Sequence, residues 1–363
     1  MLDQQVFTPI TMDFFVDGMT IPCDIYEVTG PFLVINKGCK LTAEIKDRLT
    51  QHHTRGNGLL VLKEDYPTML ENKSKKELQS KETKKEKLEK ETGFFEIKAD
   101  MLSLLEEVEE TNAIHSEKII DVSEEISHRL EITSQDTIIS LVNMLATVDE
   151  YLCRHSTNVS MLNGLIGKWL GLSREDVDSL ITAGLTHDCG KALVPLQVLN
   201  FPRPLSRAEF EVIKMHPIHS YNLLTEFPDT IRFAARAHHE KLNGKGYPDA
   251  LGKDKLTLMA RITAVSDIYD ALVSRRVYKE PRSPFQIMVI LKDIAKTDLD
   301  PFIVNTFTKH MSKELIGKPV LMSNGETGTV KNIDPDDLEF PYVKVNGVII
   351  KTSSDLSCSS MEV

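Results

Sequence analysis

One property of this chain restricts its fold more than any other. From about Phe95 to Glu314 the apolar residues recur at helical spacing, and no convincing ladder of strands interrupts them. The pattern indicates helices at about 134–152, 159–170, 174–187, 207–225, 230–239, 257–276 and 284–294. In the first of these, apolar residues up to Leu152 recur every three or four positions, which is typical of a face buried against other helices. The central part of the chain is therefore expected to be a helical bundle.

Segments with strand patterns flank this bundle. Before about residue 70, short apolar runs alternate with glycine-containing turns around a helix near 43–51, which predicts a small α+β module. After Gly317, short runs are separated by Asn-Gly turns at 324–325 and 346–347, which predicts a β-rich appendix. The predicted fold class is mainly α, with a helical bundle between an N-terminal α+β module and a C-terminal β-rich appendix.

A charged segment separates the first module from the bundle. Between Glu71 and Glu91 there are eight Lys and six Glu and few large apolar residues, so no apolar face is available for burial. We interpret this segment as a linker or a solvated helix. The predicted domains are an N-terminal regulatory module at 1–70, the charged segment at 71–94, the helical domain at 95–314 and the appendix at 315–363.

The charge balance and the cysteines exclude several classes of protein. The net charge is −11, so no general field attracts nucleic acid polymers or anionic membranes. No apolar run approaches the roughly 18 residues that span a bilayer, and the first residues do not resemble a signal peptide, so membrane insertion is not expected. The five cysteines form no CxxC pair, which favours free thiols in a reducing, cytoplasmic compartment.

The motif with the most chemical content is His187-Asp188, followed by Lys191. Adjacent side chains on a helix point about 100° apart, so both can reach an ion that lies between their directions. Lys191 follows His187 by one turn and can direct its ammonium to the same place. Taken alone, such a pair more often makes hydrogen bonds at a surface.

Five further residues have side chains that commonly bind metal ions: His155 before this motif, and His216, His238, His239 and Asp267 after it. Any lone histidine is more often a solvated or core residue, but Asp267 lies among apolar neighbours, where an unpaired carboxylate is costly to bury. Imidazole and carboxylate ligands without thiolate suit Fe, Mn or Zn. One carboxylate shared by two ions would give a two-metal centre with ions ~3.5–4 Å apart.

A glycine-rich loop follows the histidine pair. Gly244 and Gly246 permit tight backbone turns beside a ligand, Tyr247 can stack on a base, and Pro248 stiffens the end of the loop. As an isolated loop it would most often be a plain turn. Its position a few residues after His239 favours a binding role.

These motifs, in this order, resemble the HD-GYP family of bacterial cyclic di-GMP phosphodiesterases, a branch of the HD-domain metal phosphohydrolases. The similarity runs from about Asp149 to Met311. It includes His155-Ser156, His187 to Lys191, Met215-His216-Pro217, His238-His239-Glu240, Gly244 to Pro248 and Val265 to Ser274. The resemblance implies a helical, metal-dependent phosphodiesterase with two divalent ions, iron or manganese, that hydrolyses cyclic di-GMP to pGpG and often onward to GMP.

The resemblance also implies a role for each site residue. One metal would be held by His155, His187, Asp188 and Asp267, and the second by Asp188, His216, His238 and His239. The bridging Asp188 and Lys191 would be catalytic, with a hydroxide between the ions as the nucleophile. The substrate would be bound by Lys191, Gly244, Gly246, Tyr247, Pro248, Arg276 and Lys279.

Several alternatives stay open. Tyr151 stands where some members of the family have a Glu that holds a third metal, so two metals are expected and a third is kept as an alternative. The substrate could be another cyclic nucleotide such as cyclic GMP-AMP, because the ligand set does not encode the base. A catalytically idle cyclic di-GMP receptor is the other alternative, although no metal ligand is lost. The expected partners are cyclic di-GMP, a second copy of the chain and proteins of the signalling network.

Overall fold

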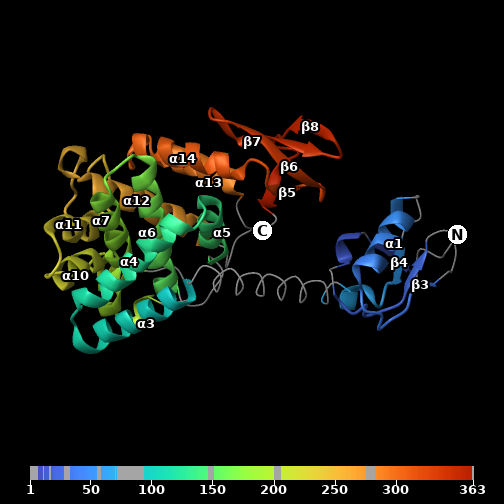
Figure 1. Cartoon of the computed structure of the whole chain (residues 1–363), viewed down its shortest axis with the longest axis horizontal. Coiled ribbons are helices and arrows are strands. Elements are labelled where there is room, and N and C mark those ends of the chain that lie inside the picture. The colour runs from blue at the N-terminus through green and yellow to red at the C-terminus, as the bar shows by residue number, and fades with distance from the viewer. Residues whose placement is uncertain are drawn as a thin grey trace. The chain divides into compact units, whose positions relative to one another are not determined.

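The computed structural model describes residues 7–10, 12–15, 18–27, 33–54, 59–69, 71, 94–145, 151–199, 206–274 and 283–361 of the chain. The chain divides into two compact units, Met1–Leu88 and Glu89–Val363 (Figure 1). The division into four segments made from composition stays a prediction.

The first unit contains the small α+β arrangement that the sequence predicted. Its antiparallel strands lie in the order β1-β4-β2-β3. The elements are β1 (Phe7–Ile10), the 3-10 helix η1 (Met12–Phe14), β2 (Ile25–Glu27), β3 (Leu33–Ile35), α1 (Ala43–Thr54) and β4 (Leu59–Leu62). Phe15, Met19 and Ile21 are fully buried in its apolar cluster, so this unit has a core of its own.

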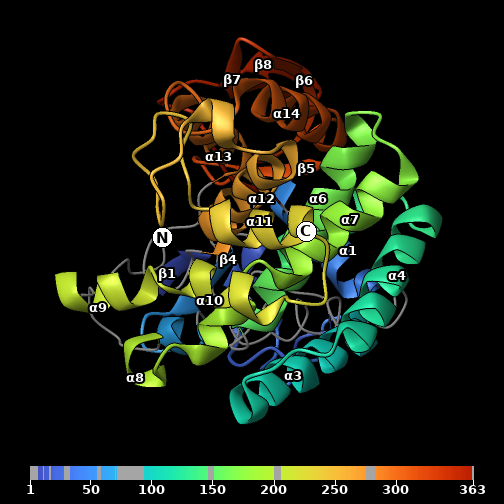
Figure 2. The same cartoon turned by 90° about the vertical axis from the view of Figure 1, so that its left-hand side faces the viewer.

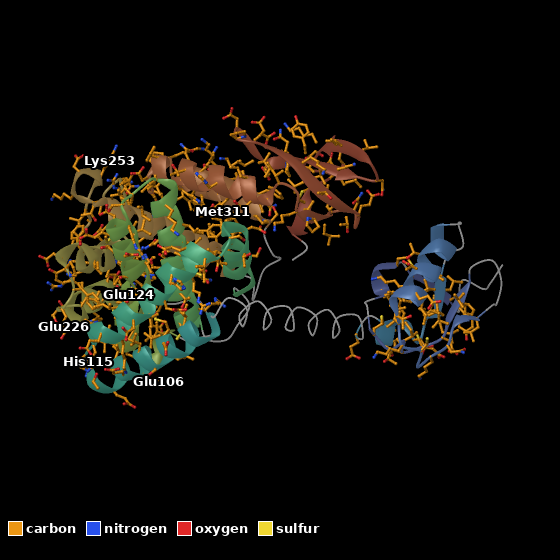
Figure 3. The ribbon with its side chains drawn as sticks, in the orientation of Figure 1. Glu106, His115, Glu124, Glu226, Lys253 and Met311 are labelled. Atoms are coloured by element: carbon orange, nitrogen blue, oxygen red, sulfur yellow. The ribbon has the colours of Figure 1, made fainter. Side chains whose placement is uncertain are left out.

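The second unit is the predicted helical bundle. Its described helices are α3 (Phe94–Thr111), α4 (Ser116–Ile132), α5 (Gln135–Leu145), α6 (Tyr151–Trp169), α7 (Arg174–Thr186), η2 (Cys189–Leu193), α8 (Leu196–Leu199), α9 (Arg207–Ile213), α10 (His216–Leu223), α11 (Asp229–Ala237), η3 (Lys253–Lys255), α12 (Leu258–Ser274), α13 (Pro284–Ile294) and α14 (Pro301–Leu315). Charged side chains such as Glu106, Glu124 and Lys253 lie on its outside, whereas Met311 is buried (Figure 3).

α6 is the central helix of this bundle, packed against α3, α4, α7, α12 and α14 (Figure 2). Every residue from Cys153 to Gly167 is buried, because neighbours cover α6 on all sides. The buried Asn163 amide donates to Leu180 O and to Thr263 Oγ1, both at 3.0 Å, and so joins α6 to α7 and α12. α6 and α12 carry one predicted ligand each, His155 and Asp267, and two more, His187 and Asp188, directly follow α7.

Three of the predicted helices have different boundaries in the structure: the one expected at 159–170 begins eight residues earlier, at Tyr151, as α6, and two others are divided. The segment expected as one helix at 207–225 is two helices, α9 and α10, separated at Lys214-Met215. Pro217 lies in the first turn of α10, where its missing N–H and fixed φ suit a helix start and not an interior. The helix expected at 134–152 ends at Leu145 as α5, residues 146–150 lie outside the described part, and α6 begins at Tyr151.

The C-terminal appendix is an antiparallel sheet in the order β8-β7-β6-β5-β9. Its strands are β5 (Pro319–Met322), β6 (Thr327–Asp334), β7 (Asp337–Val345), β8 (Val348–Lys351) and β9 (Cys358–Met361). The predicted turn between β7 and β8 has φ of 49° at Asn346 and 88° at Gly347, the left-handed backbone that such a hairpin requires. β7 packs on α13, and the Lys292 ammonium donates to Pro335 O at 2.5 Å.

Within the described residues, no helix is both long enough and apolar enough to cross a membrane.

Candidate metal centre

The seven predicted ligands lie together in the second unit. They form two groups, one with His155, His187 and Asp267 and the other with Asp188, His216, His238 and His239. The ligand atoms within each group lie within 4.8 Å of one another. Six of the seven residues are buried and His239 is partly buried. Residues separated by up to 112 positions, from His155 to Asp267, are thus brought to one place.

His187 and Asp188 converge because they lie between two helices, after the end of α7 and before the start of η2. α7 ends at Thr186, and Asp188 precedes η2 with φ of −105° and ψ of 4°. The chain therefore turns at the motif, whereas a continuous helix would point the two side chains about 100° apart. Gly190 permits this turn to lie against α10, because a Cβ there would be 2.3 Å from His216 O. The Gly190 N–H donates to Ser220 Oγ at 2.9 Å.

Three of the imidazole rings are oriented in the same way. Nδ1 of His187, His216 and His238 donates to the carbonyl oxygen of the residue three positions earlier, at 2.7, 2.6 and 2.8 Å respectively. A carbonyl oxygen only accepts, so the proton of each neutral ring is on Nδ1. Each Nε2 therefore carries a lone pair that faces the centre of the cluster.

His155 is oriented by a carboxylate that the sequence analysis did not assign. Its Nδ1 donates to Asp270 Oδ2 at 2.7 Å, and the amide of Asn158 donates to Asp270 Oδ1 at 2.6 Å. Asp270 is fully buried on α12, one turn after Asp267. A second carboxylate at this spacing in an apolar helix is the sequence signal that could have identified it, since metal-binding histidines commonly donate to a carboxylate.

The cluster has the electronic character of a cation site. The Nε2 atoms of His155 and His187 are 3.2 Å apart, and those of His216 and His238 are 3.4 Å apart. With the protons on Nδ1, each pair sets two lone pairs against each other, which is unfavourable unless a cation lies beside them. Asp188 Oδ1 is also buried, and no donor from the described residues hydrogen-bonds to it. These atoms fit divalent metal ions, whose ligands are neutral imidazole and ionised carboxylate.

Asp188 joins the two groups of ligands. Its Oδ2 lies 3.3 Å from His155 Nε2 and 3.4 Å from His187 Nε2. Its Oδ1 lies 3.1 Å from His216 Nε2 and 3.7 Å from His238 Nε2. One oxygen therefore faces each group, which is the arrangement of a carboxylate that bridges two ions.

Asp267 also reaches both groups. Its Oδ1 is 3.1 Å from His155 Nε2, and its Oδ2 is 3.6 Å from His239 Nδ1. The sequence analysis assigned Asp267 to the first ion alone, and the distances leave room for a role at both.

The protonation states suit metal binding. Burial raises the pKa of the Asp188 carboxyl, but the Lys191 ammonium and His187 outweigh it and hold this pKa well below its usual range. Burial acts on Asp267 in the same direction, and its contacts with His155 and His239 outweigh that effect, so its pKa is lowered too. Burial lowers the pKa of His238 well below 6.5 and that of His239 to about 3. At neutral pH the carboxylates are therefore ionised and these two rings are neutral.

Lys191 lies where the sequence analysis expected a cation. Its ammonium contacts Asp188 Oδ2, and its side chain is 17% exposed. It therefore reaches both the bridging carboxylate and the solvent side of the cluster, where a substrate would enter.

The glycine-rich loop is fixed to the histidine pair. A Cβ on Gly246 would lie 2.4 Å from Glu240 Cα and 2.6 Å from His239 O, so only glycine allows this approach. The buried Glu240 accepts from the backbone N–H of Asp249 at 2.6 Å and of Leu251 at 2.9 Å. Glu240 is thus a second residue whose role the sequence analysis missed: it holds the end of the loop.

Tyr247 is placed over the metal centre by this loop. Its ring centroid is 4.7 Å from that of His239. Burial, followed by the nearby Asp188 and Asp267, raises the pKa of the Tyr247 phenol far above its usual range, so it carries a neutral hydroxyl. Gly244, with φ of 72°, and Pro248 lie on either side of this position. The predicted substrate residues Arg276 and Lys279 lie outside the described residues, as does the Tyr151 side chain.

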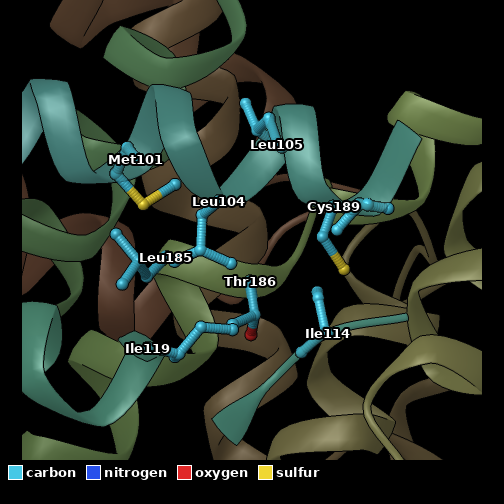
Figure 4. A pocket seen from close by; sticks show the side chains of 9 residues that line it. Met101, Leu104, Leu105, Ile114, Ile119, Leu185, Thr186 and Cys189 are labelled. Atoms are coloured by element: carbon cyan, nitrogen blue, oxygen red, sulfur yellow. The ribbon is translucent and has the colours of Figure 1, made fainter. Parts of the chain in front are cut away.

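An apolar pocket lies beside the His187-Asp188 motif, and the residues directly before and after the motif help to line it (Figure 4). It is lined by Met101, Leu104, Leu105, Val108, Ile114, Ile119, Leu185, Thr186 and Cys189. Burial raises the pKa of Cys189 to about 12, and its thiol belongs to neither group of ligand atoms. α3 therefore packs through apolar contacts against the segment that carries His187 and Asp188.

Comparison with known proteins agrees with these observations. Residues 140–303 match the family model described as an HD domain. The chain is 31% identical over 253 residues to Cyclic di-GMP phosphodiesterase PA4108 of Pseudomonas aeruginosa, a match that covers 68% of this chain and 60% of that protein. It is 34% identical over 153 residues to 3'3'-cGAMP-specific phosphodiesterase 3 of Vibrio cholerae, covering 42% of this chain and 33% of that protein. The chain thus spans less than two thirds of these relatives.

A solved structure shares the fold. Bd1817, described as an HDG"Y"P protein from Bdellovibrio bacteriovorus, aligns with a TM-score of 0.51 and 16% identity over 84% of this chain and 99% of that chain. This likeness concerns the fold. The family match and the sequence identities show that residues 140–303 are an HD domain, and the order of the motifs in this region resembles the HD-GYP branch of that family.

Proposed function

We propose that the protein is a metal-dependent phosphodiesterase that hydrolyses cyclic di-GMP to pGpG and in a further step to GMP. The observation that carries the proposal is the buried cluster itself, in which four Nε2 lone pairs and both oxygens of Asp188 face one another in two groups. The similarity to a relative named as a cyclic di-GMP phosphodiesterase supports the substrate.

The ligand assignment follows the two groups. His155, His187, Asp188 and Asp267 would hold one ion, and Asp188, His216, His238 and His239 the other, with Asp188 shared. Imidazole and carboxylate ligands without thiolate suit Fe, Mn or Zn, and the resemblance to the HD-GYP family favours iron or manganese. When bound, a pair of such ions supplies positive charge to the phosphoryl oxygens and lowers the pKa of water.

The chain's own residues position the reaction. Asp270 and the three carbonyl oxygens hold the rings in the tautomer that offers Nε2. Lys191 would offer its ammonium to a phosphoryl oxygen or to the leaving sugar oxygen, since it already lies beside Asp188. The loop with Gly244, Gly246, Tyr247 and Pro248 would cover the substrate, and Arg276 and Lys279 would bind its phosphates.

The test is product analysis under anaerobic conditions. Cyclic di-GMP is incubated with protein reconstituted with Fe(II) or Mn(II), and the products and metal content are measured beside Asp188→Ala. Metal-dependent formation of pGpG or GMP that is lost in Asp188→Ala supports the proposal. A fully metallated protein that binds cyclic di-GMP without cleaving it would show a receptor instead.

A second candidate substrate is 3'3'-cyclic GMP-AMP. The relative from Vibrio cholerae named for this specificity is 34% identical over the matched region. The metal ligands would act at the phosphodiester and do not distinguish guanine from adenine, so both substrates suit the same centre. Parallel assays with the two cyclic dinucleotides at equal concentration distinguish them by kcat/KM.

The first unit is proposed as the regulatory or dimerising module. It has its own apolar core, as a module that folds independently requires.

A further inference from the structure

A short helix beside the proposed active site exposes apolar side chains without a folding reason. α9 spans Arg207–Ile213, and none of its residues is buried. Figure 2 shows it extending away from the body of the bundle. Phe210 is 45% exposed and Val212 is 41% exposed, although exposed apolar surface contributes nothing to folding.

Phe210 is connected to the metal centre through Tyr247. The two rings meet edge to face, with centroids 6.3 Å apart and an interplanar angle of 77°. Tyr247 in turn lies 4.7 Å from His239. A continuous series of rings thus leads from a metal ligand to the exposed surface of Phe210.

A cation lies at the edge of this aromatic surface. The Lys214 ammonium is 5.7 Å from the ring centroids of both Phe210 and Tyr247. The Glu211 carboxylate holds it, with Nζ–O distances of 3.0 Å. A planar group stacked on Phe210 would therefore present its edge to a fixed positive donor.

We propose that Phe210 and Lys214 form a guanine-binding subsite for the cyclic dinucleotide. A base is joined to its phosphate through one ribose, so a phosphate at the metal centre leaves a base free to reach the neighbouring aromatic surface. Aromatic rings bind bases by stacking, and Lys donates to the O6 and N7 acceptors of guanine, where adenine has an N6 donor. The inference rests on the proposed function, because it assumes a cyclic dinucleotide substrate.

The stacking role is tested with the full-length, Mn(II)-loaded protein. Phe210→Ala raises the KM for cyclic di-GMP about tenfold, equivalent to about 1.4 kcal/mol, and leaves kcat and metal content unchanged. Phe210→Trp keeps a ring and restores the KM. Val212→Ala removes a similarly exposed apolar side chain of the same helix and serves as the matched control, with no change in KM.

The guanine preference is tested with Lys214→Gln. The variant reduces about tenfold the preference for cyclic di-GMP over cyclic di-AMP, measured by competition between the two. If Phe210→Ala behaves like Val212→Ala, or Lys214→Gln weakens both dinucleotides equally, the subsite is overturned while the proposed function stands. If the unsubstituted protein, fully metallated, neither binds nor hydrolyses a purine cyclic dinucleotide, the proposed function itself fails and the subsite with it.

Discussion

At the scale of single residues, the metal centre depends on side chains that hold the ligands. Four of the histidine rings have a hydrogen-bond acceptor at Nδ1. For His155 this acceptor is a side chain, and for the other three it is a backbone carbonyl. A backbone carbonyl cannot be removed by substitution, whereas Asp270 can. Asp270 is therefore the residue at which the orientation of a ligand can be changed without touching the ligand.

The first prediction concerns this carboxylate. Asp270→Asn allows the amide to donate to His155 Nδ1, which moves the ring proton to Nε2 and blocks that ligand atom. We expect metal affinity to fall about 10- to 100-fold, with a matching loss of activity at limiting metal. Titration calorimetry with Mn(II) measures the affinity, and Asp293→Asn, an exposed carboxylate on α13, is the control. Unchanged affinity in Asp270→Asn would contradict the assigned role.

The second prediction concerns pH. The pKa of His239 is lowered to about 3 and that of His238 lies well below 6.5, both by burial. At a pH between the lowered pKa of each ring and about 6.5, its usual pKa, the unfolded chain binds protons that the folded, metal-free protein does not. The free energy of unfolding therefore decreases as the pH falls from about 6.5, by up to about 1.4 kcal/mol per pH unit for each ring.

Urea unfolding of the metal-free protein between about pH 7 and pH 5 measures this slope. His239→Asn removes one of the two rings and should make the slope shallower. A stability that is constant over this range would show that the rings bind protons equally in both states.

At the scale of elements, the glycine-rich loop is the part whose position is most constrained. Three contacts fix it: the Gly246 approach to 239–241, the Glu240 carboxylate on two loop N–H groups, and the Arg236 guanidinium on Asp249 at 2.7 and 2.8 Å. The loop therefore positions Tyr247 as part of the histidine segment, not as a free flap.

The third prediction uses two glycines of this region. In Gly246→Ala the new Cβ would meet Glu240 Cα at 2.4 Å, so the loop must move and Tyr247 with it. We expect kcat/KM for cyclic di-GMP to fall at least about tenfold with metal content retained. Gly252→Ala is the matched control, because its nearest atom is Leu242 O at 3.9 Å. Equal activity of the two variants would show that the loop does not position the substrate.

At the scale of the whole molecule, the metal centre joins α6, α7, α10, α11 and α12. Each pair of facing Nε2 atoms opposes this assembly until a cation is bound. Ligands that bind only the folded state raise the free energy of unfolding, by about 4 kcal/mol at a concentration one thousand times Kd. We therefore expect the stability of the second unit to depend on metal.

The fourth prediction follows from this linkage. Removing metal from the full-length protein with a chelator lowers the Tm of the transition that belongs to the second unit, and Mn(II) restores it. The first unit holds none of the seven ligands, so its transition does not shift. Scanning calorimetry with and without chelator separates the two. A transition of the second unit that is insensitive to metal would contradict the cation site.

Local patterns in the sequence predicted the class of fold and the candidate ligand residues. Helical spacing from about 95 to 314 predicted the bundle, the Asn-Gly pair at 346–347 predicted a hairpin turn, and the ordered motifs named all seven ligands. These features are local: a helix period, a turn residue and a residue type are written in neighbouring positions.

The resemblance to a known family implied how the ligands are grouped, whereas the packing of distant segments determines how they face one another and how they are held. Spacing along the chain does not say that His155 faces His187, that Asp188 turns one oxygen to each group, or that Asp270 orients a ring. Those relations depend on how α6 crosses α7 and α12, and Gly184 permits that crossing because a Cβ there would lie 2.6 Å from Ser160 Cα. Side-chain packing between distant segments sets these distances, and no local pattern contains them.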